Sequence, residues 1–253
     1  MTAAVFSPII QAYMAKVGVE AVKRGLDWGA MSEEERMKFA SDYCKGFARN
    51  NEEKSESQRR EEERARSLER QRRIESELMR LEREMPPKYI GARTTDFSDK
   101  NPVIPHILGG GSCLLTGVPG LGKTHMIWAV ARAMVERGEK LDEIKVINLQ
   151  DLVCDIKENG KSNWARYTKQ AYGNYKHLFI DEFDKVYGGI SDYTIISDLV
   201  SYRYDNLLPT VIAGNGERQI ALDILGGAVY SRLTGKADGG AYFPIGGEDR
   251  RSR

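Results

Sequence analysis

GVPGLGKT, at residues 117–124, follows the apolar run CLLT at 113–116 and precedes an amphipathic segment that reaches about Arg137. Glycines ahead of a Lys-Thr pair, between a strand and a helix, are the pattern of a phosphate-binding loop. The glycines let backbone N–H groups converge on phosphates, and the N-terminus of the helix adds partial positive charge. We expect Lys123 to reach the β- and γ-phosphates and Thr124 to bind Mg²⁺. Other predicted nucleotide contacts are Gly117, Val118, Pro119, Gly120, Leu121, Gly122 and His125.

A second motif, HLFIDEFDK at 177–185, ends an apolar strand in the acidic pair Asp181-Glu182. Open α/β sheets hold their ligands at the carboxyl ends of the strands. We expect Asp181 to contact the nucleotide and hold Mg²⁺, and Glu182 to polarise the attacking water as a general base. The two motifs together predict an ATPase that uses ATP and Mg²⁺.

Short apolar runs alternate with amphipathic segments through the rest of this region. The predicted strands are CLLT at 113, KVINL at 145, HLFID at 177, TVIAGN at 210 and AYFPI at 241. Strand and helix in alternation predict an α/β fold, with a parallel five-stranded sheet that carries helices on both faces.

The composition divides the chain into three parts. Residues 1–50 have apolar residues at helical spacing and a helix-start signal at Ser32, which predicts a small helical module. Residues 51–86 are rich in Glu and Arg three or four apart, which predicts a charged helical linker. Two readings of this segment stay open, a solvated spacer or a helix with an apolar stripe for a partner. Its few large apolar residues are Leu68, Ile74, Leu78 and Leu81. Pro86-Pro87 ends that helix, so the catalytic domain is predicted to span 87–253.

Bulk properties exclude several classes of protein. The net charge is +1, from 38 basic and 37 acidic residues, so any contact with nucleic acid must come from a local patch. Three widely spaced cysteines fit neither a disulfide framework nor a zinc site. Neither a cleavable leader nor a membrane span is recognisable. We expect a cytoplasmic protein with no membrane partner.

Five stretches together resemble the DnaC/DnaI-type replicative helicase loaders, which are AAA+ ATPases related to the IstB-type transposition ATPases. The resemblance covers about residues 88–253 and lies in GARTTDF (91–97), TGVPGLGKTH (116–125), FIDEFDK (179–185), SDLVSYRYDNLLPTVIAGN (197–215) and ALDILGGAVYSRL (221–233). It implies an AAA+ P-loop domain without a full lid domain.

The resemblance also implies roles for single residues. Asn215 falls on the sensor 1 position, which helps to orient the lytic water. Arg232 falls on the arginine finger, which reaches into a neighbouring subunit's ATP site in an ATP-bridged ring or spiral. Arg250 lies near the sensor 2 position. Ser191 and Tyr193 match positions that contact single-stranded DNA.

A further candidate for DNA contact is the stretch DIKENGKSNWARYTKQ, at 155–170, where basic residues alternate with aromatic ones. Lys157 and Lys161 suit phosphates, and Trp164 suits stacking on a base. A solvated loop with core aromatic residues is the alternative.

The leading hypothesis is an ATP-dependent loader that delivers a hexameric, DnaB-type replicative helicase onto single-stranded DNA during replication initiation. The short chain with its own N-terminal module favours a bacteriophage or mobile-element origin. Two alternatives stay open: an IstB-like transposition helper ATPase that acts on duplex DNA, and an interaction protein that uses ATP as a switch.

Overall fold

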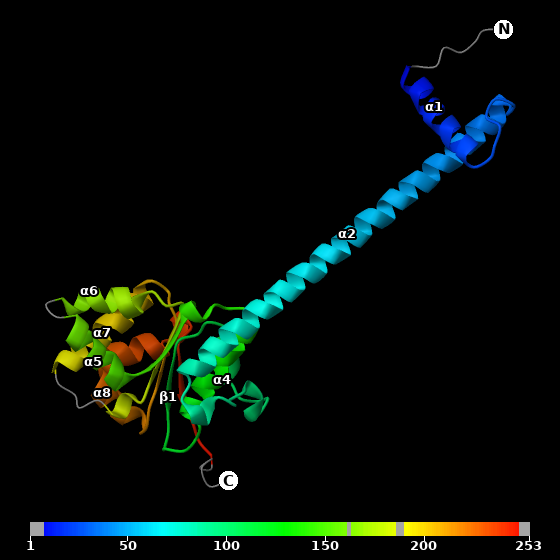
Figure 1. The fold of residues 1–253 in the computed structure, drawn as a ribbon. Coiled ribbons are helices and arrows are strands. Elements are labelled where there is room, and N and C mark those ends of the chain that lie inside the picture. The colour runs from blue at the N-terminus through cyan, green and yellow to red at the C-terminus, as the bar shows by residue number, and fades with distance from the viewer. Residues whose placement is uncertain (1–7, 161–162, 186–189, 248–253) are drawn as a thin grey trace. The chain divides into compact units, whose positions relative to one another are not determined.

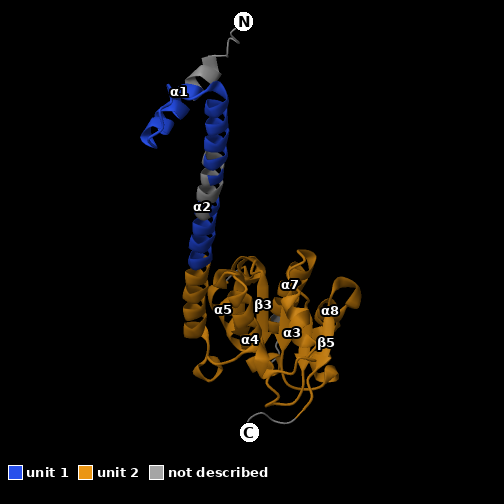
Figure 2. Cartoon of the chain, turned by 90° about the vertical axis from the view of Figure 1, so that its right-hand side faces the viewer, with its two compact units in different colours: residues 1–69 blue, residues 70–253 orange. Residues whose placement is uncertain are grey.

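The computed structural model describes residues 8–160, 163–185 and 190–247 of the chain, in part without side chains inside α1, α2 and α7. The chain forms two compact units, residues 1–69 and residues 70–253 (Figure 2). No helix within the described residues is long and apolar enough to cross a membrane.

The smaller unit contains α1 (Pro8–Lys23) and the first part of α2 (Glu33–Glu84). The predicted helix start is confirmed, because the hydroxyl of Ser32 accepts from the backbone N–H of Glu35 at 3.2 Å while the Ser32 N–H donates to the Glu35 carboxylate at 2.7 Å. This reciprocal pair is a capping box, which satisfies N–H groups that a helix start leaves unpaired.

Helix α2 continues without interruption to Glu84 and contributes to both units. Arg60 pairs with Glu56 at 2.9 Å and Arg66 with Glu62 at 3.9 Å, the four-residue spacing that supports an exposed helix. The boundary predicted after residue 50 falls within this helix. Residues 70–86 belong to the larger unit, so the predicted boundaries do not coincide with the division between the units.

The larger unit is built on a five-stranded parallel sheet in the order β2-β3-β4-β1-β5. The strands are β1 (Cys113–Thr116), β2 (Ile144–Asn148), β3 (His177–Asp181), β4 (Thr210–Ala213) and β5 (Ala241–Pro244). All five predicted strands and their parallel arrangement are confirmed. The acidic pair and the phosphate-loop strand thus lie two strands apart, separated by β4.

Helices cover both faces of this sheet (Figure 1). Alternate strand residues enter two separate cores: Cys113 and Leu115 pack toward α3, α4 and the end of α2, whereas Leu114 packs toward α5, α7 and α8. The helices are α3 (Val103–Leu108), α4 (Lys123–Glu136), α5 (Leu149–Asn159), α6 (Trp164–Thr168), α7 (Ile190–Asp205) and α8 (Arg218–Thr234). One-turn segments are Pro87–Tyr89, Thr94–Asp96, Leu141–Glu143, Lys169–Gly173, Phe183–Lys185 and Lys236–Asp238.

The apolar stripe at the end of α2 is used inside the larger unit. Leu81 and Met85 are buried in the core that contains α4, and Leu78 packs against it. Glu77 accepts the backbone N–H of Leu141 at 3.2 Å, and Arg80 donates to Asp142 at 2.6 Å. The last turns of the helix are therefore an integral part of this unit.

Arg203 on α7 is a fully buried cation that holds the edge of the second core. Its guanidinium donates to the hydroxyl of Thr210 at 2.9 Å and to the main-chain carbonyls of Tyr172, Gly173, Tyr175 and Pro209 at 2.6–3.3 Å. Burial lowers the pKa of Arg203 to about 10. The contacts tie α7 to the start of β4, the strand that leads to Asn215.

We predict that Arg203→Ala destabilises the protein by about 3 kcal/mol, because it leaves several buried carbonyls without a donor. Urea denaturation of the full chain measures this change. Arg72→Ala, which removes an exposed guanidinium from α2, serves as the control. Equal stabilities of the two variants would contradict the role given to Arg203.

Candidate functional site

The loop at 117–122 has a backbone that only glycine adopts easily. Gly117, Gly120 and Gly122 have φ values of 145°, 87° and 88°, all in the region that disfavours side chains. A Cβ atom on Gly117 would also lie 2.4 Å from the carbonyl oxygen of Ile245. Gly117 exchanges two backbone hydrogen bonds with Gly216, at 3.1 and 3.3 Å, which fixes the loop beside the end of β4.

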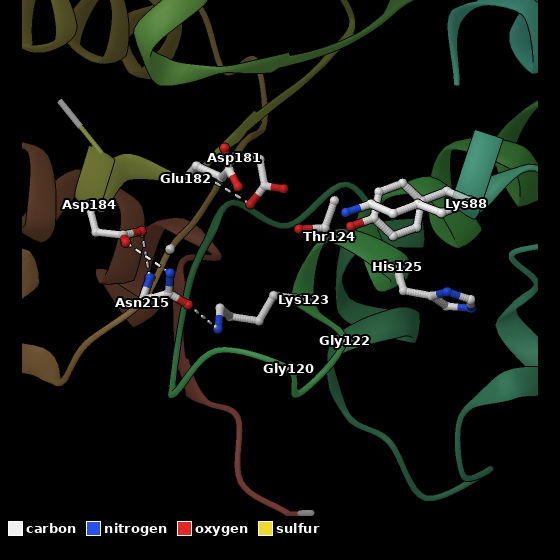
Figure 3. Close-up of a pocket in the computed structure, with 12 residues that line it drawn as sticks. Lys88, Gly120, Gly122, Lys123, Thr124, His125, Asp181, Glu182, Asp184 and Asn215 are labelled. Atoms are coloured by element: carbon white, nitrogen blue, oxygen red, sulfur yellow. Dashed lines mark hydrogen bonds between the residues drawn. The ribbon is translucent and has the colours of Figure 1, made fainter. Parts of the chain in front are cut away.

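Lys123, the first residue of α4, points back into this loop. Its amino group donates to the carbonyls of Gly117 and Val118 at 2.9 Å and to Oδ1 of Asn215 at 3.0 Å. The side chain is only 6% exposed. The predicted phosphate-binding lysine and the predicted sensor residue are thus in direct contact (Figure 3).

Asp181, the last residue of β3, contacts the first turn of α4 at Thr124. It accepts hydrogen bonds from the hydroxyl of Thr124 and, at 2.9 Å, from the backbone N–H of Glu182. Burial raises the pKa of Asp181 above its usual value, and those two hydrogen bonds oppose the rise. The Thr124 hydroxyl and the Asp181 carboxylate are hard oxygen donors, which is the kind of ligand that Mg²⁺ prefers. Phosphate oxygens would complete the coordination of the ion.

Glu182 has a backbone conformation that is rare for a residue with a side chain, with φ at 57°. Such strain is often found where a side chain is aimed at a reaction. One carboxylate oxygen of Glu182 lies 2.6 Å from the amino group of Lys185, one turn farther along the chain. This pairing holds the predicted general base at the rim of the site.

Asp184 is a site residue that the sequence reasoning missed. One oxygen of its carboxylate accepts the backbone N–H of Asn215 at 2.7 Å, and the other accepts the side-chain amide at 2.8 Å. The amide nitrogen of Asn215 therefore faces Asp184, and its oxygen faces Lys123. Gly214 permits this approach, since a Cβ there would lie 2.8 Å from the Asp184 carboxylate. Asp184 lies three residues after Asp181, but nothing in the local sequence marks it as a site residue.

These residues enclose a cavity of about 340 Å³ (Figure 3). It is lined by Lys88, Tyr89, Gly120, Gly122, Lys123, Thr124, His125, Asp181, Glu182, Asp184, Gly214 and Asn215. A second cavity of about 660 Å³ adjoins it, and Lys88, Tyr89, Thr124, Asp181 and Glu182 line both. No motif in the sequence had pointed to Lys88 or Tyr89.

His125 joins the segment before the core to the start of α4. Its Nε2 lies 2.6 Å from the carboxylate of Asp96, and its ring lies 6.2 Å from that of Tyr89 and 5.7 Å from that of Phe97.

The predicted contacts Gly117, Val118, Pro119 and Leu121 do not line the cavity. Val118 is exposed and Leu121 is buried.

Arg232 lies away from the two cavities, on α8. Its guanidinium donates to the carbonyl of Ala228 at 3.3 Å and lies 5.9 Å from the ring centre of Tyr204. It lines neither cavity. Arg250 falls outside the described residues.

The predicted DNA contacts are spread over α5, α6 and α7. Lys157 forms an ion pair with Asp192, and Trp164 packs against the second core with its indole N–H buried. Tyr193 is 41% exposed. Lys161 and the side chain of Ser191 fall outside the described part of the chain. The described residues thus offer Tyr193 as the accessible aromatic ring of this set.

Comparison with known proteins supports the same fold. Residues 113–212, less than half of the chain, match the ATPase family associated with various cellular activities (AAA). No curated protein matches the sequence.

Solved structures of similar fold include two that the sequence resemblance had suggested. The DnaC helicase loader is 22% identical, with a TM-score of 0.49 over 64% of this chain and 100% of its own. DnaI is 18% identical, with a TM-score of 0.50 over 66% of this chain and 94% of its own. The replication initiator DnaA bound to AMPPCP and single-stranded DNA is 18% identical, with a TM-score of 0.52 over 64% of this chain and 51% of its own, so this chain spans about half of DnaA. The larger unit therefore has the AAA+ P-loop fold, and DnaI confirms the resemblance to the loaders in fold.

We predict that Asp184→Asn lowers the rate of ATP hydrolysis about tenfold while ATP affinity changes less than about twofold. The substituted side chain offers one acceptor oxygen where two donors of Asn215 need one each, so the Asn215 amide loses its fixed orientation. Steady-state hydrolysis and fluorescent-nucleotide titration measure the two quantities. Asp205→Asn, an exposed carboxylate outside both cavities, is the control. An equal loss of affinity and turnover would point to general damage instead.

Proposed function

We propose that this protein is an ATP-dependent loader that places a hexameric, DnaB-type replicative helicase onto single-stranded DNA, in a bacteriophage or mobile-element setting. The observation that carries the proposal is a Walker-type site within an AAA+ fold, in a chain that also has a separate helical unit. The general activity that this fold supports is that of an ATPase.

The chemistry follows from groups already in contact. ATP supplies the phosphates, with Mg²⁺ held by Thr124 and Asp181. Lys123 exchanges the loop carbonyls and the Asn215 oxygen for phosphate oxygens. Asn215 stays held by Asp184 and orients the attacking water, and Glu182 accepts the proton of that water once its carboxylate leaves Lys185.

Arg232 acts on a neighbouring subunit in this proposal. It lies outside its own nucleotide cavity, on a helix that packs into the second core through Ala221, Leu225 and Val229. A guanidinium keeps its charge and grips phosphate with several donors, so it suits the ATP site of the next subunit in a ring or spiral. The residues proposed to contact single-stranded DNA are Tyr193, Ser191, Lys157, Lys161 and Trp164.

The helicase would bind the smaller unit. Large apolar side chains are exposed on α1 and around the start of α2, namely Val19, Val22, Leu26 and Met37. Among the described residues of this unit these side chains are exposed, and in this proposal they supply the apolar contacts to the helicase. The adjacent buried residues Val17 and Ala21 keep the helix folded.

The test of the proposal is co-purification with the replicative helicase of the same host, with and without ATP. We expect the full-length protein to retain the helicase. The Val22→Asp variant should retain at least about tenfold less, because the substitution places a carboxylate in an apolar contact. Lys16→Ala on the same helix is the control. Failure of the unmodified protein to bind the helicase, together with an ATP-dependent preference for duplex DNA, would favour a transposition helper instead.

A second test addresses assembly. We predict that Arg232→Ala keeps ATP affinity within about twofold but lowers hydrolysis about a hundredfold, because its phosphate lies on the next subunit. Mixing it with inactive Lys123→Ala subunits should restore part of the hydrolysis. Arg218→Ala on the same helix is the control. If mixing restores nothing, the action across subunits is wrong.

A further inference from the structure

The nucleotide cavity receives a lysine from outside the two nucleotide motifs. Lys88 belongs to the single turn Pro87–Tyr89, which begins shortly after α2 ends at Glu84. It lines both cavities together with Thr124 and the acidic pair. In Figure 3 the extended side chain of Lys88 approaches Thr124 from the side opposite Lys123.

The charge on Lys88 is positioned but not neutralised. Its amino group lies 4.7 Å from the ring centre of Tyr89, within the range of a cation–π contact. Among the described residues no carboxylate forms an ion pair with it, although Asp181, Glu182 and Asp184 line the same cavity. A lysine in such a place is available to an anionic ligand.

A further cation suits the charge balance of the site. A triphosphate brings about four negative charges, and the carboxylates of Asp181, Glu182 and Asp184 line the cavity, against one Mg²⁺, the ammonium of Lys123 and the Lys185 ammonium that pairs with Glu182. No arginine is among the described residues that line either cavity.

We propose that Lys88 is a nucleotide-binding residue that contacts the terminal phosphate of ATP and distinguishes ATP from ADP. The proposal rests on the ATPase function proposed above and adds a residue that neither the phosphate loop nor the acidic strand supplies. The assignment to the terminal phosphate follows from the neighbours of Lys88: Thr124 and Asp181, the Mg²⁺ donors, and Glu182, the general base.

The segment that carries Lys88 is anchored at both of its ends. Arg132 on α4 donates to the carboxylate of Glu82, before Lys88, at 2.7 Å and to the carbonyl of Ile90, after it, at 2.5 Å. Arg132 is 2% exposed and lies on the helix that starts with Lys123. A phosphate that binds Lys88 therefore acts on a short, anchored connection to α2.

The experiment measures the affinities of full-length protein for fluorescent ATP and ADP, each with Mg²⁺. We expect Lys88→Gln to weaken ATP binding about tenfold and ADP binding less than about threefold, since a charge-assisted contact to one phosphate is lost. Lys88→Arg should keep most of the preference for ATP. Lys140→Gln, an exposed lysine that lines neither cavity, should match the unmodified protein.

Hydrogen exchange of the backbone over residues 85–92 gives an independent readout. ATP should slow this exchange in the unmodified protein and in Lys140→Gln, but not in Lys88→Gln. An unchanged ratio of ATP to ADP affinity in Lys88→Gln, or ATP-dependent protection that persists in it, would overturn the proposal. If the unmodified protein binds neither nucleotide, the proposed function fails and this inference fails with it.

Discussion

The amino group of Lys123 is the point on which the geometry of the site depends. It is almost fully buried, and a buried ammonium group is tolerated only when its donors are satisfied. Two carbonyls of the glycine loop and the Asn215 oxygen supply that satisfaction. Since phosphate oxygens are stronger acceptors, the same arrangement is a preformed place for a ligand that replaces them.

The sheet order explains how distant residues reach that lysine. β4 lies between β1 and β3, so the residues that follow these three strands meet at one edge. Asn215 can then contact Lys123 on one side and Asp184 on the other, at 3.0 and 2.8 Å. Arg203 holds the opposite end of β4, because it donates a hydrogen bond to Thr210 at the start of that strand.

The sequence was most informative where one local pattern determines one local structure. The glycine loop, the Asp181-Glu182 pair and the five apolar runs could be placed because strand, loop and helix each have a recognisable period or composition. Asp184 and Lys88 could not, since their roles come from contacts made across the fold. A carboxylate three residues after Asp181, or a lysine after two prolines, has no property that marks it apart from many surface residues.

The charged helix shows the same limit in a different form. Its composition left two readings open, a solvated spacer or a stripe for a partner, and the last turns instead pack within the larger unit: Leu81 is buried, and Glu77, Arg80 and Glu82 bond to residues of the α4 region. A helix that alternates charge can present one face to water along most of its turns and pack only its last turns, and the overall composition hides that change. Because the packed turns lead directly into the segment with Lys88, the end of the helix and the nucleotide site belong to one continuous structure. Through this connection, a change in the bound nucleotide has a direct physical route to α2.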